Sequence, residues 1–187
     1  MLQIAYLSLI GLLLIFAYIV FRIIVRHDYA VRGKLGVISS SLQLLVFAMF
    51  FAFPYLFNPP EWGWFWMMGD SSSRGLRLAG LLLICSGFVV AFGIMIWFGI
   101  GRAFGLHTRG LVKVGPYRIS RNPQILGGYL LLMGTTLQTP SLYMVGWMLS
   151  YVLIAHWMVT TEEENLHQIY GEEYEAYCSE VPRYLFI

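Results

Sequence analysis

Residues 111–123 read Leu111-Val112-Lys113-Val114-Gly115-Pro116-Tyr117-Arg118-Ile119-Ser120-Arg121-Asn122-Pro123, and this polar, basic stretch separates two strongly apolar regions. Glycine and proline fix the backbone of a turn, so the Gly115-Pro116 pair predicts a shaped loop instead of a loose linker. Pro123 opens the next apolar run. Composition alone favours a cytoplasmic loop whose arginines only orient the protein in a membrane.

The composition of the whole chain is that of a membrane protein. Of the 187 residues, 58% are hydrophobic and 12% are charged, whereas a soluble domain is about half apolar and about one quarter charged. We therefore predict that residues 1–187 form a single integral membrane domain. Cys85 and Cys178 have no metal-ligand spacing with another Cys or His, so we expect no metal site, and we expect no nucleic-acid partner.

Five apolar segments predict membrane-spanning helices. They are Leu2–Phe21, Val37–Phe57, Leu78–Phe98, Ile125–Gln138 and Ser141–Val159. The first has no basic region before it and no small-residue cleavage site after it, so we expect a retained helix. The fourth is short for a full span, and we expect it to form a tight transmembrane hairpin with the fifth. The expected fold is an all-α integral membrane helix bundle of about five transmembrane helices.

The basic residues predict the orientation of the bundle. Nine of the 12 Lys and Arg residues fall in segments 22–34 and 102–121. Cytoplasmic loops carry the excess of positive charge, so an odd number of spans puts the N-terminus outside and the C-terminus in the cytoplasm. The Trp-rich segment 58–77 is then an interfacial belt on the outer face. Segments 102–124 and 160–187 would share the cytoplasmic face, where they can meet.

The acidic tail predicts a C-terminal amphipathic cytosolic helix. Apolar and aromatic residues recur at helical spacing through residues 166–177, opposite the glutamates of 172–175. The pattern Thr161-x-x-Glu164 fits a capping box at the start of this helix, which would by itself explain the three consecutive glutamates of 162–164. Gly171 interrupts the pattern and predicts a bend. A role of these glutamates in a binding site is the alternative explanation.

Taken together, these motifs resemble the membrane methyltransferases of the isoprenylcysteine carboxyl methyltransferase and phospholipid methyltransferase superfamily. The resemblance lies in Leu111-Val112-x-x-Gly115-Pro116-Tyr117-Arg118-x-x-Arg121-Asn122-Pro123, Glu163-Glu164-x-Leu166, Tyr170-Gly171-x-x-Tyr174-x-x-Tyr177 and Val181-Pro182-Arg183. It covers roughly the C-terminal half of the chain. The chain departs from the family pattern at Asn122, where His is common, and at Ile125, where Tyr is common.

The resemblance implies S-adenosylmethionine as cofactor, in a cytosolic-facing pocket formed by 102–124 and 160–187. The cofactor-binding residues would be Leu111, Val112, Gly115, Pro116, Tyr117, Asn122, Pro123, Glu163 and Glu164. The catalytic residues would be Arg121, Glu164 and Arg183. Asn122 would donate its amide to the cofactor carboxylate, and the glutamates would meet the ammonium or the ribose. His156 is a candidate general base, or simply a histidine bonded to a neighbouring helix.

The preferred function is methyl transfer to a lipophilic acceptor that enters from the bilayer. Methyl transfer from a sulfonium is an in-line displacement, so the protein must mainly position two substrates and exclude water. The acceptor would be an isoprenylcysteine-type carboxylate held by Arg183, with an ethanolamine-type phospholipid amine as the alternative. Two functions of another class are the alternatives: an NADPH-dependent membrane reductase and a non-enzymatic membrane scaffold.

Overall fold

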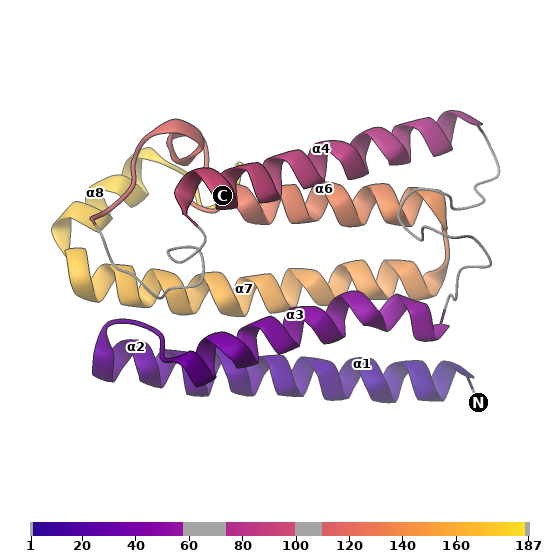
Figure 1. The fold of residues 1–187 in the computed structure, drawn as a ribbon, viewed down its shortest axis with the longest axis horizontal. Helices are drawn as coiled ribbons and strands as arrows, with labels where there is room; N and C mark the ends of the chain where they lie inside the picture. Colours follow the sequence, from indigo (N-terminus) through magenta and orange to yellow (C-terminus); the bar gives the residue numbers. More distant parts are fainter. Residues whose placement is uncertain (1, 58–73, 100–109, 186–187) are drawn as a thin grey trace.

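The computed structural model describes residues 2–57, 74–99 and 110–185. In these ranges the chain is helical, without strands: α1 (Leu2–Tyr18), a π-helix (Ile19–Val25), α2 (Arg26–Arg32), α3 (Val37–Phe57), α4 (Arg74–Phe98), a 3₁₀ turn (Gly115–Arg118), α6 (Pro123–Gln138), α7 (Leu142–Tyr170) and α8 (Glu172–Glu180). The long helices lie side by side as a bundle (Figure 1). The predicted all-α class is confirmed. The predicted Trp-rich belt falls largely outside the described residues.

Four helices of the described part are long and apolar enough to cross a membrane: Gln3–Arg32, Val37–Pro54, Arg74–Phe98 and Leu142–Tyr170. The fourth predicted span, Ile125–Gln138, corresponds to α6, which has 16 residues. At about 1.5 Å per residue α6 is shorter than the roughly 30 Å hydrocarbon core. It leads into α7 through a short connection at 139–141, as the hairpin prediction required.

The predicted start of a separate tail helix at Thr161 is wrong. Helix α7 runs without interruption from Leu142 to Tyr170, and its N-cap is Ser141, whose side chain accepts a hydrogen bond from the Met144 amide. Thr161 lies buried in the middle of this helix, where its hydroxyl donates to the Phe21 carbonyl at 3.1 Å. The bend at Gly171 is present, with φ +47°. The C-terminal amphipathic helix is therefore α8, which begins at Glu172.

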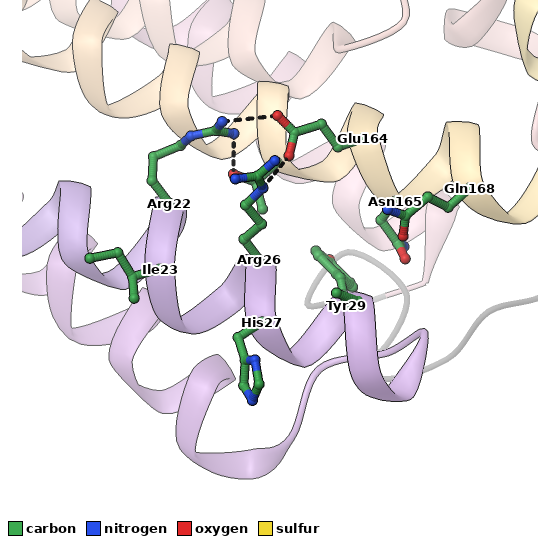
Figure 2. A pocket seen from close by; sticks show the side chains of 10 residues that line it. Arg22, Ile23, Arg26, His27, Tyr29, Glu164, Asn165 and Gln168 are labelled. Carbon is green, nitrogen blue, oxygen red and sulfur yellow. Dashed lines mark hydrogen bonds and ion pairs between the residues drawn. The ribbon is translucent and has the colours of Figure 1, made fainter.

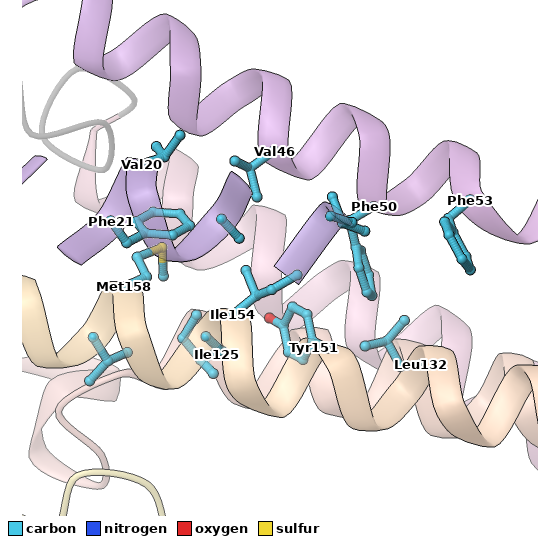
Figure 3. Close-up of a cluster of buried hydrophobic side chains, with 14 of the residues drawn as sticks. Val20, Phe21, Val46, Phe50, Phe53, Ile125, Leu132, Tyr151, Ile154 and Met158 are labelled. Atoms are coloured by element: carbon cyan, nitrogen blue, oxygen red, sulfur yellow. The ribbon is translucent and has the colours of Figure 1, made fainter. Parts of the chain in front are cut away.

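The apolar core joins α1, α3, α6 and α7 (Figure 3). Phe50 of α3 stacks on Trp147 of α7 with ring centroids 5.0 Å apart. The Trp147 indole also donates a 2.9 Å hydrogen bond to the Phe50 carbonyl, so this buried ring keeps a polar partner without water. The core fixes α7 between α1–α3 on one side and α6 on the other.

Helices α4 and α6 pack at backbone distance through glycines. A Cβ atom added at Gly87 would lie 2.5 Å from the Leu131 amide nitrogen and 2.6 Å from the Gly127 carbonyl oxygen. Gly134 meets the backbone of α4 in the same way, at Gly80. Small residues allow such close approach between membrane helices. This contact holds the start of α6, and with it the basic loop 110–122, at one end of the bundle.

Candidate functional site

The basic loop and the acidic tail meet at that end of the bundle, as the sequence predicted (Figure 1). The Tyr177 hydroxyl of α8 donates to the Tyr117 carbonyl at 2.6 Å. Lys113 Nζ lies 3.0 Å from Glu173 Oε1. The Arg121 backbone amide donates to the Pro182 carbonyl at 2.9 Å, and this backbone hydrogen bond joins the loop to the C-terminal segment.

At the centre of this junction, Arg121, Glu163 and Arg183 form an ion cluster. Arg183 reaches Glu163 Oε2 with both Nη2 (2.6 Å) and Nε (2.9 Å). Arg121 Nη1 lies 3.2 Å from Glu163 Oε1. The Arg121 and Glu163 side chains are 13% and 12% exposed, so the cluster is held in a medium where charge interactions are stronger than at the surface. The hydrogen bond to Glu163 raises the pKa of Arg183 above its ordinary value. Two guanidinium groups against one carboxylate leave an excess of positive charge.

The turn Gly115–Arg118 positions the loop so that Arg121 reaches the ion cluster. Gly115 has φ +61°, a left-handed conformation that favours glycine, and an added Cβ would lie 3.1 Å from the Trp97 ring. Tyr117 is buried beside Phe98, with ring centroids 5.2 Å apart. The predicted shaped turn is thus a 3₁₀ turn with Pro116 at its start. Its aromatic anchor fixes the residues that follow, up to Arg121.

Asn122 and Pro123 open α6 as the sequence suggested, but the Asn122 side chain is already engaged. Pro123 occupies the first turn of the helix, and Asn122 has φ −132°, outside the helical region. Asn122 Nδ2 donates to the Arg183 carbonyl at 3.2 Å, and the residue is 5% exposed. Ser120 Oγ donates to the same carbonyl at 3.2 Å. In this structure Asn122 therefore positions the Arg183 segment.

Leu111 belongs to a small apolar cluster around Tyr174, Tyr177 and Val181. Val112 is half-buried next to it in the chain. Burial raises the pKa of Tyr177 to about 12 and raises that of Tyr174 as well. Both phenols stay neutral at physiological pH, and both side chains pack in this cluster.

Glu164 lies on a different side of α7 from Glu163. Its Oε1 is 2.9 Å from Arg22 Nη2 and its Oε2 is 2.7 Å from Arg26 Nε. Arg22 Nη1 also donates to Thr161 Oγ1 at 3.0 Å. Figure 2 shows both arginines reaching across to Glu164. The structure thus brings Glu163 to Arg121 and Arg183 but places Glu164 outside that cluster.

Sequence reasoning missed two groups near these sites. Arg22 and Arg26 were interpreted only as orientation charges, although their spacing of four residues puts them on one helix face. Glu162 was assigned to helix-start chemistry, yet it lies within α7 and no ion pair or hydrogen bond joins it to another residue of the described ranges. His156 is exposed on the surface of α7.

Within the described ranges, no group of three or more His, Cys, Asp or Glu residues could hold a metal ion. A family model described as phospholipid methyltransferase matches residues 76–173, which covers more than half of the chain and includes the loop, Arg121 and the glutamates of α7. No match was found among curated proteins or among solved structures.

Proposed function

Because this chain belongs to the phospholipid methyltransferase family, we propose that it transfers a methyl group from S-adenosylmethionine to a lipophilic acceptor that enters from the bilayer. Family membership makes the protein a membrane methyltransferase. The methyl donor and the acceptor are parts of the proposal. The observation that carries it is the Arg121–Glu163–Arg183 cluster, in which the two polar segments of the sequence meet at one end of the apolar bundle.

The cluster has the polar groups that an amino-acid moiety requires. Arg121 Nε and Glu163 Oε1 are buried and make no hydrogen bond in the part of the chain that the structure describes. Glu163 Oε1 has only the ion pair with Arg121 Nη1 at 3.2 Å. Buried polar atoms are costly when they are unsatisfied. A ligand carboxylate could accept from Arg121, and a ligand ammonium could donate to Glu163. S-adenosylmethionine carries both groups on one carbon, so the residues present fit this cofactor.

The protein's own contribution would be positioning. When bound, the cofactor supplies an electrophilic methyl group on a sulfonium. The fixed loop Gly115–Arg118 and the buried ion cluster would hold it in one orientation and keep water away, which is the main requirement of an in-line displacement. Leu111, Val112 and Tyr117 would line the site, and Asn122 would support it through its bond to the Arg183 carbonyl.

For the acceptor we retain an isoprenylcysteine-type carboxylate, which is already nucleophilic and would be positioned by Arg183. Two of the three Arg183 nitrogens contact Glu163, and Nη1 has no partner among residues of the described ranges. An ethanolamine-type phospholipid amine is the second candidate, because such an amine must lose a proton before it attacks. The carboxylate of Glu162, which has no ion-pair or hydrogen-bond partner among the described residues, supports that candidate.

We also propose that the site faces the cytoplasm, with the N-terminus outside. The support is the excess of basic residues in segments 22–34 and 102–121. Of these segments, residues 22–34 and 110–121 lie at the same end of the bundle as the cluster.

Calorimetry on the detergent-solubilised full chain tests the cofactor assignment. We expect S-adenosylmethionine to bind and NADPH not to bind. Arg121→Gln should weaken binding by about tenfold or more, since a charged hydrogen bond contributes about 1.5–3 kcal/mol. Arg118→Gln is the matched control, because Arg118 is exposed in the same loop. Binding of NADPH alone would favour a reductase, and binding of neither would favour a scaffold.

A further inference from the structure

A pocket lies between α7 and the segment 22–30, on a different side of α7 from the ion cluster. Its volume is about 470 Å³. It is lined by Arg22, Ile23, Arg26, His27, Tyr29, Ala30, Thr161, Glu164, Asn165 and Gln168. Figure 2 shows Arg22 and Arg26 on one wall and Glu164, Asn165 and Gln168 on the other. The two arginines outnumber the one glutamate, so the pocket favours an anion.

The pocket begins where the apolar part of the first helix ends. The 20 residues from Leu2 to Phe21 are nearly all apolar and, at about 1.5 Å per residue, match the hydrocarbon thickness of roughly 30 Å. One turn before the pocket, Tyr18 and Trp157 pack with ring centroids 5.3 Å apart, and such rings favour the membrane–water interface. The arginines are therefore at the depth of lipid headgroups.

The pocket offers both kinds of hydrogen-bonding group to a ligand. Arg26 uses Nε for Glu164, while its two terminal nitrogens have no acceptor among the residues that the structure describes, and its side chain is 58% exposed. Asn165 is 6% exposed, and its Oδ1 has no donor within the described ranges. A ligand that satisfies both would carry an anion and, close to it, an N–H or O–H donor.

We propose that this pocket holds the headgroup of a membrane phospholipid, with the phosphate on Arg26 and Arg22 and a headgroup ammonium or hydroxyl on Asn165. The guanidinium fork matches phosphate oxygens, and basic pockets between membrane helices at the cytoplasmic side bind lipid phosphates. Ile15, Ile19 and Ile23 are exposed at intervals of four residues along the same helix, and they continue the pocket wall as an apolar surface for the acyl chains.

The site is separate from the proposed methyl-transfer centre. Glu164 binds the arginines of the pocket, whereas Glu163 binds those of the ion cluster. The wall formed by 22–30 also precedes the part of the chain that matches the family, which begins at residue 76. The other wall, with Thr161, Glu164, Asn165 and Gln168, lies within that part. Because the pocket and the ion cluster use different carboxylates of α7, binding of the lipid would not depend on methyl transfer.

The test is binding of short-chain lipids to the cofactor-free full chain in a maltoside detergent, which has no phosphate. Dihexanoylphosphatidylethanolamine should bind at least about tenfold more tightly than dihexanoylglycerol, which lacks the phosphate, and than inorganic phosphate, which lacks the chains. Arg26→Gln should lose about tenfold in affinity for the phospholipid, and Arg26→Lys should lose less. Arg32→Gln should bind normally, since Arg32 is as exposed (61%) but does not line the pocket.

Asn165→Leu provides a second, independent measurement. The native protein should prefer the ethanolamine lipid to dihexanoylphosphatidylcholine, whose headgroup has no N–H donor, and this preference should disappear in the variant. Equal phospholipid affinity of Arg26→Gln and the native chain would overturn the proposal. So would equal affinity for inorganic phosphate, which would make the ligand a free anion, or a parallel loss of S-adenosylhomocysteine binding in Arg26→Gln, which would make the pocket a cofactor site.

Discussion

Replacing Glu163 by Gln should destabilise the cofactor-free protein. The carboxylate accepts from Arg183 through two nitrogens and lies 3.2 Å from Arg121. Gln keeps one oxygen acceptor but loses the charge that balances two guanidinium groups. The side chains of Glu163 and Arg121 are largely buried, so neither bulk water nor salt can replace the missing charge effectively.

The magnitude follows from this burial. Removing one partner of a buried ion pair costs about 3–5 kcal/mol, and the amide oxygen that remains recovers about 1 kcal/mol as a neutral hydrogen bond. We expect a net loss of about 3 kcal/mol. For a chain of this length, 1 kcal/mol corresponds to about 2–4 °C in Tm, so Glu163→Gln should lower Tm by roughly 6–12 °C.

Thermal unfolding in detergent, followed by tryptophan fluorescence without cofactor, measures this loss. Glu173→Gln is the matched control: Glu173 pairs with Lys113 at 3.0 Å in the same junction, but its side chain is 58% exposed. Exposed pairs contribute about 0–1 kcal/mol, so this variant should lose no more than about 4 °C. Equal Tm values for the two variants would refute the claim that the ion cluster holds the loop and the tail together.

Two further predictions concern the bundle and its orientation. Gly87→Ala should push α4 away from α6 and lower the free energy of unfolding by about 1–3 kcal/mol. Gly93→Ala is the control and should be tolerated, because the Cβ position of Gly93 faces open space. Equal thermal stability of the two variants would contradict the close α4–α6 contact. The orientation can be tested in a chain without its native cysteines, with an impermeant thiol reagent applied from outside. The reagent should label a cysteine placed in 60–72 and should not label one placed in 108–114. The reverse pattern would show that the predicted orientation is wrong.

The features predicted well from sequence are those that local chemistry determines. Val37–Phe57 was predicted with both boundaries as observed, because an uninterrupted apolar run has only one stable form in a bilayer. The turn at Gly115-Pro116 and the bend at Gly171 follow from residues with restricted or permissive backbones. The meeting of loop and tail followed from the distribution of charge along the chain.

The failures occurred where tertiary contacts override a local pattern. A threonine followed three residues later by glutamate is a valid helix-start pattern, but Thr161 is buried against the first helix and bonds to Arg22 and to the Phe21 carbonyl. These partners are about 140 residues away in sequence, so no local pattern could reveal them. With its hydroxyl satisfied there, Thr161 is not needed as a cap, and α7 continues through it.

The continuation of α7 changes what the three glutamates can do. Successive residues of an α-helix are about 100° apart around its axis, so adjacent side chains do not face the same partner. Glu163 therefore faces the loop and the C-terminal segment, and Glu164 faces the first helix. In a helix that started at Thr161, all three carboxylates would lie in the first turn, at the positive end of the helix dipole. Because α7 instead runs on, one short acidic run can serve two arginine pairs, and the same helix separates the proposed methyl-transfer centre from the lipid pocket.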